Sequence, residues 1–221
     1  MPPGCVAWWL LLPLAVFSLA TATDLQPNVT GDVTLTTAGS PWVVKNTVYV
    51  EETGSLTVEP GVTVLMASGA SLLVYGQLVA DGTESDHIQF TLLDSRNKTE
   101  GLQPDPLPVD CLQLPHWGVI ALLNVTMTHR INYVDISCGG QDASDARSTE
   151  YNGAALYATS NVFAMSNVVV SQSAQNGIEL VHVMSSLSVI NVTVNDNHET
   201  GLKIVYEPQT SVIANVHAAR K

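Results

Sequence analysis

The sequence predicts an all-β fold in which short strands stack in parallel into a solenoid, because two unrelated markers repeat with one period. Three glycines and three Asn-Val pairs each recur at the same constant step, and the segments around them alternate apolar and polar residues like half-buried strands. One repeat is long enough for roughly three short strands and their turns, and it cannot bury its own apolar face, so the repeats must stack. The markers are Gly153, Gly177 and Gly201, and Asn167-Val168, Asn191-Val192 and Asn215-Val216.

The composition supports one folded core and excludes several classes of partner. Of the 221 residues, 46% are hydrophobic and 13% are charged, with 8 Lys and Arg against 20 Asp and Glu for a net charge of −12. So little charge is atypical of disordered chains and of helical bundles, whose surfaces are rich in Glu and Lys. An acidic surface repels nucleic acids and anionic membranes, so neither is an expected partner.

The N-terminus predicts a secretory signal peptide over residues 1–22. Val6 to Leu19 is nearly all apolar and is followed by Ala20-Thr21-Ala22, a small-x-small cleavage pattern. This run is shorter than the roughly 20 apolar residues that span a bilayer, and a buried hydrophobic helix is the alternative interpretation. We expect no membrane span beyond the signal peptide, and we expect the mature chain to be secreted.

We interpret the cysteines and the sequons on the expectation that the chain is secreted. Cys5 leaves with the signal peptide, so Cys111 and Cys138 remain and are expected to form one disulfide in an oxidising compartment. Closing that loop stabilises the fold by about 3 kcal/mol on the chain-entropy argument. Four N-x-Ser/Thr sequons predict glycosylation, and they lie at Asn28, Asn97, Asn124 and Asn191.

The repeats resemble a right-handed parallel β-helix. The run from Gly54 to Thr83 is similar to the opening turns of extracellular β-helices, with Pro60-Gly61 turning a corner. In such folds asparagines stack into a ladder at one turn, which is expected here for Asn167, Asn191 and Asn215; three ordinary turn asparagines are the alternative. We expect the ladder amides to point inward.

The organisation predicted from these patterns has three parts. A signal peptide (1–22) precedes an N-terminal cap segment (23–42), and a parallel β-helix occupies 43–221. The step from Val134 to Val168 exceeds the period by ten, which predicts a loop near 138–147, and a second, proline-rich loop is expected near 94–111. The chain stops just after a strand begins a new turn, so we expect a stack open at its C-terminal end, in a truncated product.

Beyond the fold, the whole mature chain resembles the N-terminal segment of the bark beetle (anakonda) family of invertebrate junction proteins. The resemblance rests on "GDVTL" at Gly31, "SPWVV" at Ser40, the "LTVEPGV" run, "HWGVI" at His116, "YVDIS" at Tyr133 and "YNGAALYA" at Tyr151. It implies one piece of a large single-pass protein of epithelial junctions, which joins β-helix blocks to scavenger-receptor and lectin-like modules. Those later modules are not in this sequence.

No residue set predicts catalysis. β-Helices also include pectate lyases and uronate epimerases, which need clustered carboxylates on one open strip. The turn from Asp196 to Glu199 is the best local candidate, yet its counterpart one repeat earlier is Gln172 to Gln175. The acidic run from Asp81 to Asp86 lacks the EF-hand pattern and is interpreted as a solvated turn, with a weak Ca²⁺ contact as the alternative. The six histidines lack metal-ligand spacing. We therefore predict neither a metal nor a cofactor.

The aromatic residues leave a carbohydrate function open. Trp117 is expected in the core. Core or edge packing is also the preferred interpretation for Tyr151, Tyr157 and Tyr206, and the alternative is that they line one face of the stack. The leading hypothesis is a non-enzymatic extracellular scaffold or adhesion module that binds proteins or itself, with glycans as a further partner class. The alternative is a secreted carbohydrate-binding or carbohydrate-active β-helix.

Overall fold

The computed structural model describes residues 22–93, 111–123, 126–141, 151, 153–159, 162–183, 185–205 and 210–219. Within these ranges the protein is all β apart from short 3-10 turns, which include η1 (Thr37–Gly39) and η3 (Cys111–Gln113). The predicted signal peptide and most of the two predicted loops lie outside the described residues.

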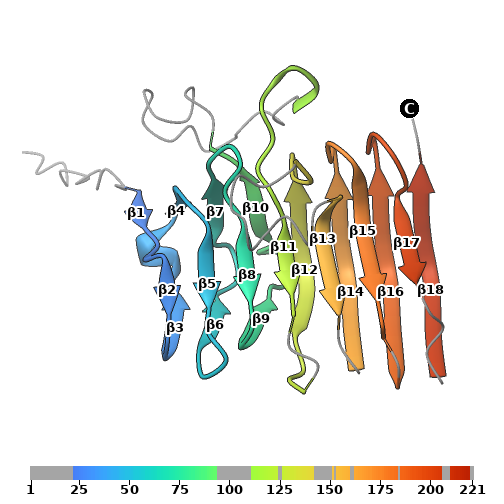
Figure 1. Cartoon of the computed structure of the whole chain (residues 1–221), viewed down its shortest axis with the longest axis horizontal. Helices are drawn as coiled ribbons and strands as arrows, with labels where there is room; N and C mark the ends of the chain where they lie inside the picture. Colours follow the sequence, from blue (N-terminus) through green and yellow to red (C-terminus); the bar gives the residue numbers. More distant parts are fainter. Residues whose placement is uncertain are drawn as a thin grey trace, which may run out of the picture.

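The strands form two sheets in which every pairing is parallel, and Figure 1 shows them stacked in chain order from blue β1 to red β18. The seven-stranded sheet contains β2 (Asn28–Val29), β5 (Val48–Val50), β8 (Leu72–Val74), β11 (Ile120–Leu122), β13 (Ala154–Thr159), β15 (Asn176–Val181) and β17 (Leu202–Val205). The eleven-stranded sheet contains β1 (Thr23–Asp24), β3 (Asp32–Leu35), β4 (Trp42–Val44), β6 (Ser55–Val58), β7 (Thr63–Met66), β9 (Gln77–Asp81), β10 (Ile88–Leu92), β12 (Arg130–Ser137), β14 (Val162–Ser171), β16 (Ser186–Asn195) and β18 (Thr210–Ala219).

The chain returns to the same sheet positions once per repeat, and we call one pass through both sheets a rung. Strand β12 shows how the eleven-stranded sheet curls, because its first residues pair with β9 and its later residues pair with β10. In the rung before it, β9 and β10 are separate strands joined by residues 82–87. This all-parallel, curled arrangement is consistent with a parallel β-solenoid.

A single residue of left-handed backbone bends each long strand. The residue is Tyr133 in β12, and it is Asn167, Asn191 and Asn215 in β14, β16 and β18, with φ between 49° and 54°. Asparagine tolerates this conformation better than β-branched residues, because its short amide can bond locally. The Asn-Val markers therefore recur where the strand must turn a corner.

The core consists of columns of apolar side chains in register. One column contains Val134, Val168, Val192 and Val216, which pair in series on neighbouring strands. Their separations in the sequence are the one long step and the two regular steps that the repeat predicts. The first three are buried, and each buried valine contributes roughly 1.5 kcal/mol or more through the hydrophobic effect. One contiguous core runs from Leu25 to Val194.

The glycine markers do not form the single column that their spacing suggests. Gly177 belongs to the same column as Gly201, because Ile178 pairs with Leu202, but its partner on β13 is Ala155. Ala154 pairs with Asn176, a step two positions short of the period, so Gly153 falls opposite Gln175. The expectation for Gly153 is wrong because the connection from β13 to β14 is two residues shorter than the connection from β15 to β16.

The two ends of the stack differ in how well their core is covered. Residues 23–42, predicted as a cap, form strands β1 to β3 and pair in parallel with the next rung. Their apolar side chains are covered, since Val29 and Leu35 are 1% and 0% exposed. In the last described rung, Ile213 of β18 pairs with the buried Val189 and is 49% exposed. Among the described residues, the core is therefore better covered in the first rung than in the last.

Candidate functional site

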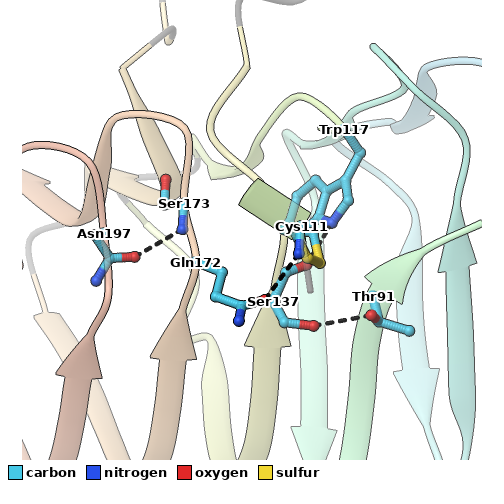
Figure 2. Close-up of a disulfide and its surroundings, with 8 residues drawn as sticks. Thr91, Cys111, Trp117, Ser137, Gln172, Ser173 and Asn197 are labelled. Atoms are coloured by element: carbon cyan, nitrogen blue, oxygen red, sulfur yellow. Dashed lines mark hydrogen bonds between the residues drawn. A yellow bond between two sulfur atoms is a disulfide. The ribbon is translucent and has the colours of Figure 1, made fainter. Parts of the chain in front are cut away.

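A disulfide joins η3 to the end of β12 beneath a buried tryptophan (Figure 2). The sulfurs of Cys111 and Cys138 are bonded, and their Cα atoms lie 5.5 Å apart. Trp117 is fully buried, as expected for a core residue, and its Nε1 donates to the Ser137 carbonyl at 2.7 Å. The backbone N–H of Cys111 donates to Gln172 Oε1 at 3.3 Å, which ties the disulfide to the next rung.

The predicted asparagines stack in a ladder of side-chain hydrogen bonds. Asn191 Nδ2 donates to Asn167 Oδ1 at 3.0 Å, and Asn215 Nδ2 donates to Asn191 Oδ1 at 2.8 Å. The three residues share one register position on β14, β16 and β18. The alternative of three unrelated turn asparagines is therefore wrong.

The ladder continues past the predicted residues and ends on a carboxylate. Asn167 Nδ2 donates to Asn132 Oδ1 at 2.9 Å, and Asn132 Nδ2 donates to Asp81 Oδ1 at 3.0 Å. Sequence reasoning missed Asn132 because Tyr133, not Asn132, is the register counterpart of Asn167. The sequence feature that could have identified Asn132 is an asparagine one residue before the expected ladder position.

The base of the ladder carries an ion pair. Arg130 Nη1 lies 3.0 Å from Asp81 Oδ2. The hydrogen bond from Asn132, together with Arg130, holds the pKa of the Asp81 carboxyl below its usual value, although burial opposes this shift. Asp81 is consequently an ionised acceptor at neutral pH, and the amide of Asn132 must turn its Nδ2 toward it.

The ladder lies on the outer side of the stack, which corrects the expectation that its amides point inward. Asn191 and Asn215 are exposed, whereas Val192 beside Asn191 is fully buried. At each bend the left-handed asparagine is the more exposed residue, and the valine that follows it is the more buried one. The sequon at Asn191 is thus accessible in position, but its amide nitrogen is engaged with Asn167.

Of the other three sequons, the one at Asn28 lies within the described residues. Asn28 is exposed on β2, where it pairs with Tyr49 of β5. Asn97 and Asn124 lie outside the described residues.

The turn from Asp196 to Glu199, the best candidate for carboxylate chemistry, is used to join rungs. Asn197 is buried, and its Oδ1 accepts the backbone N–H of Ser173 at 2.9 Å (Figure 2). The backbone N–H groups of His198 and Glu199 donate to the carbonyls of Ser173 and Gln175. Its hydrogen bonds thus connect neighbouring rungs, and Glu199 itself is exposed.

The second acidic run is divided between two networks. Asp81 faces Arg130 and Asn132, while Asp86 Oδ2 accepts hydrogen bonds from Ser85 and Thr83 in its own turn. Across the part of the chain that the structure describes, no group of three His, Cys, Asp or Glu side chains could hold a metal ion.

An apolar and aromatic cluster lies on the outer face of the seven-stranded sheet, separate from the core. We call it the aromatic patch. Its strands alternate, so their other side chains face the core. Along the register, Tyr157 of β13 is followed by Glu179 of β15 and Lys203 of β17. The patch comprises the buried residues Tyr49, Leu73, Val119 and Ala121 and the half-buried residues Tyr75, Leu123, Tyr151 and Tyr157.

The edge of the aromatic patch combines ring faces with charge. The rings of Tyr151 and Tyr157 lie 5.3 Å apart at 49°, and Lys203 Nζ lies 2.7 Å from Glu179 Oε1. Burial, and then the nearby Glu179 carboxylate, raise the pKa of the Tyr157 hydroxyl. The structure brings together two of the three predicted tyrosines, and Tyr206 lies outside the described residues. The sequence feature that could have predicted the other members of the patch is that apolar residues occupy both faces of β5, β8 and β11.

Two histidines occupy contrasting environments. His129 is buried, and its Nδ1 accepts the backbone N–H of Leu78 at 3.2 Å, a structural role that the sequence did not indicate. Partial burial lowers the pKa of His116, near the disulfide, although hydrogen bonds with the backbone of Gln172 and Leu114 oppose this shift.

Two surfaces thus remain as candidates for binding: the ladder and the half-buried tyrosines of the aromatic patch. Within the described ranges, no helix is both apolar enough and long enough to cross a bilayer. Comparison with protein-family models, with curated proteins and with solved structures found no match to this chain.

Proposed function

We propose that this chain is an extracellular, non-enzymatic scaffold or adhesion module built as a right-handed parallel β-helix. The observation that carries the proposal is the continuous register of rungs, in which the most polar side chains serve the stack itself. Asp81 anchors the ladder, and Asn197 locks one rung to the next. Such a stack is a rigid spacer whose long sides serve as binding surfaces.

The cysteine pair supports the extracellular location. Cys111 and Cys138 are both fully buried and bonded to each other, and such structural disulfides persist in oxidising compartments. Together with the apolar N-terminal run, this supports secretion after cleavage of residues 1–22. The location at cell junctions follows only from the resemblance to the bark beetle family.

The test is to display the mature chain on non-adherent cells through a membrane anchor fused to its N-terminus. We expect cell clusters to exceed those formed by cells that carry the anchor alone. The purified chain should not cleave uronic-acid polymers, with or without Ca²⁺. Turnover that is lost in both His198→Ala and Glu199→Gln would replace the scaffold proposal with an enzyme, and failure to cluster would remove the adhesion role.

A carbohydrate-binding function is the second candidate, and the Tyr151–Tyr157 pair beside Glu179 favours it. Aromatic ring faces next to a carboxylate are suited to the apolar faces and hydroxyl groups of a sugar. A glycan array with the purified chain tests this candidate, because Tyr157→Ala should abolish any specific signal. A signal that Tyr157→Ala leaves unchanged would exclude the aromatic patch.

A further inference from the structure

One histidine occupies a position in the apolar core. His129 is 1% exposed and lies directly before β12, at the register of Leu78 on β9 and of Phe163 on β14. Both neighbours are buried, and the column continues through the buried Leu56 of β6 and Leu187 of β16. The imidazole is thus flanked by hydrocarbon, where an unpaired charge is costly.

The hydrogen bond of His129 fixes where its proton lies. The backbone N–H of Leu78 donates to His129 Nδ1 at 3.2 Å. A ring nitrogen that accepts a hydrogen bond carries no proton, so the ring is neutral and its proton is on Nε2. A second proton would have to enter at Nδ1, where two N–H groups would then face each other. The closed contact is therefore compatible with the neutral ring and incompatible with the imidazolium.

The interior provides no charge that would compensate an imidazolium. Among the described residues, no Asp, Glu, Lys or Arg side chain is buried. Of the strands that contact β12, β10 and β14 carry no titratable side chain within their bounds. The titratable groups of the other strands and of β12 itself are Asp81 on β9, Tyr157 on β13, and Arg130, Tyr133 and Asp135 on β12.

These titratable groups already have other partners. Asp81 is bound by Arg130, and Asp135 is bound by His87 at 3.1 Å. Both carboxylates are partly exposed, so they do not belong to the core that surrounds His129. A proton on this ring would therefore be retained only after the ring has left the core.

The start of β12 forms a unit separate from the rest of the strand. Residues 130–132 pair with β9, whereas the residues after the left-handed bend at Tyr133 pair with β10. Gln77 Nε2 on β9 also donates to the Thr128 carbonyl at 3.1 Å. Loss of the His129 contact therefore frees this half of the strand from β9, while the other half keeps its pairing with β10.

We propose that His129 makes the junction between β9 and the start of β12 sensitive to mild acid. An exposed histidine takes up a proton near pH 6.5, so protons bind to the opened junction and not to the closed one. Stability from the closed contact is complete above about pH 6.5, and below it each further unit of pH favours opening by up to about tenfold. This regulation goes beyond the scaffold function and does not depend on what the stack binds.

The test is amide hydrogen exchange in the full mature chain, because the N–H of Leu78 is itself the donor to His129. After correction for the intrinsic exchange rate, the protection of Leu78 should fall about tenfold between pH 7.5 and pH 5.5. The protection of residues 187–194 in β16 is the internal reference and should stay unchanged. Equal protection of Leu78 at the two pH values would overturn the proposal.

Variants assign the response to one ring. His129→Asn keeps an oxygen acceptor near the position of Nδ1 but takes up no proton, so the pH response of Leu78 should disappear. His217→Asn, at an exposed position on β18, should respond as the wild type does. Partial burial also lowers the pKa of His116, so His116→Asn is the second control and should leave the response intact. A response that persists in His129→Asn, or that is lost in His116→Asn, would contradict the proposal.

A direct view of the ring decides the question if His129→Asn fails to fold. Nitrogen chemical shifts of the wild-type imidazole at pH 7.5 should identify the neutral ring with its proton on Nε2. A ring protonated on Nδ1 at that pH, or a folded chain at pH 5.5 that holds His129 as a buried imidazolium, would show that the proposal is wrong.

Discussion

Asn191 donates its side-chain amide to Asn167, one rung earlier in the chain, across 3.0 Å on the outer side of the stack. The pair belongs to a chain of amides that starts at the Asp81 carboxylate and ends at Asn215. Asn167, Asn191 and Asn215 also bend their strands through left-handed backbone, whereas Asn132 does not. At these three positions the ladder therefore combines a conformational preference with a hydrogen bond. The two contributions can be separated by mutation.

Replacing Asn191 should destabilise the stack through both contributions. Asn191→Leu removes two ladder hydrogen bonds and places a γ-branched residue in left-handed backbone, so we expect a loss of about 2–3 kcal/mol in the free energy of unfolding. Asn191→Gly keeps the backbone conformation accessible and should lose less. Urea unfolding followed by circular dichroism measures both. Equal midpoints for the wild type and Asn191→Leu would show that the ladder does not stabilise the fold.

Glycosylation should discriminate between two exposed sequons. A glycan on Asn191 would be attached to the Nδ2 atom that donates to Asn167, so it would place a sugar between rungs. Asn28 is exposed on β2 and lies outside the ladder. In protein secreted from eukaryotic cells, we expect high occupancy at Asn28 and low occupancy at Asn191 by glycopeptide mass spectrometry. High occupancy at Asn191 would be incompatible with a ladder in the secreted molecule.

Loss of the disulfide should lower stability without changing the fold. The Cys111→Ala, Cys138→Ala double variant opens a loop between residues 27 positions apart, which corresponds to about 3 kcal/mol on the chain-entropy argument. The urea midpoint of this variant should match that of the reduced wild type. A midpoint equal to that of the oxidised wild type would mean that the bond adds no stability.

Acid should weaken the base of the ladder. The pKa of Asp81 is lowered in the folded state, first by the hydrogen bond from Asn132 and then by Arg130, so the folded state prefers the ionised carboxylate. Its contribution to stability is present above the unfolded value of about 3.9 and is lost as the pH falls through the lower folded value. Asp81→Asn should therefore flatten the stability profile below about pH 4, and Asp32→Asn on β3 is the control. A profile that Asp81→Asn leaves unchanged would contradict this account.

Alkali should act on the aromatic patch. Burial and Glu179 raise the pKa of Tyr157 above its ordinary value of 10.0, so the folded state prefers the neutral phenol. This contribution is complete below that value and is lost as the pH rises through the unfolded and then the folded pKa. In Tyr157→Phe the decline of stability above about pH 10 should be shallower, as measured by urea midpoints between about pH 9 and pH 11. A steeper decline in the variant would show that the sign is wrong.

Local patterns predicted much of the fold because they report local preferences. The alternation in β16 and the asparagines at its bend follow from strand geometry and from the left-handed preference of asparagine, which act within a few residues. The long step from Val134 to Val168 and the regular step from Val168 to Val192 are also visible in the chain, since each rung repeats the same core position. Trp117 is in the core, as expected of a large apolar ring at the start of a strand.

The sequence by itself determined the period, the three ladder asparagines Asn167, Asn191 and Asn215 and the apolar columns, whereas the tertiary structure decided how these parts meet. The register of Gly153 depends on a connection two residues shorter than its counterpart, and such differences add up only when the rungs are stacked. The side to which the ladder points, and the Asp81 carboxylate that orients it from the preceding rung, depend on which face the neighbouring rungs cover. Contacts between rungs join residues distant in sequence, so no local preference of the chain encodes them.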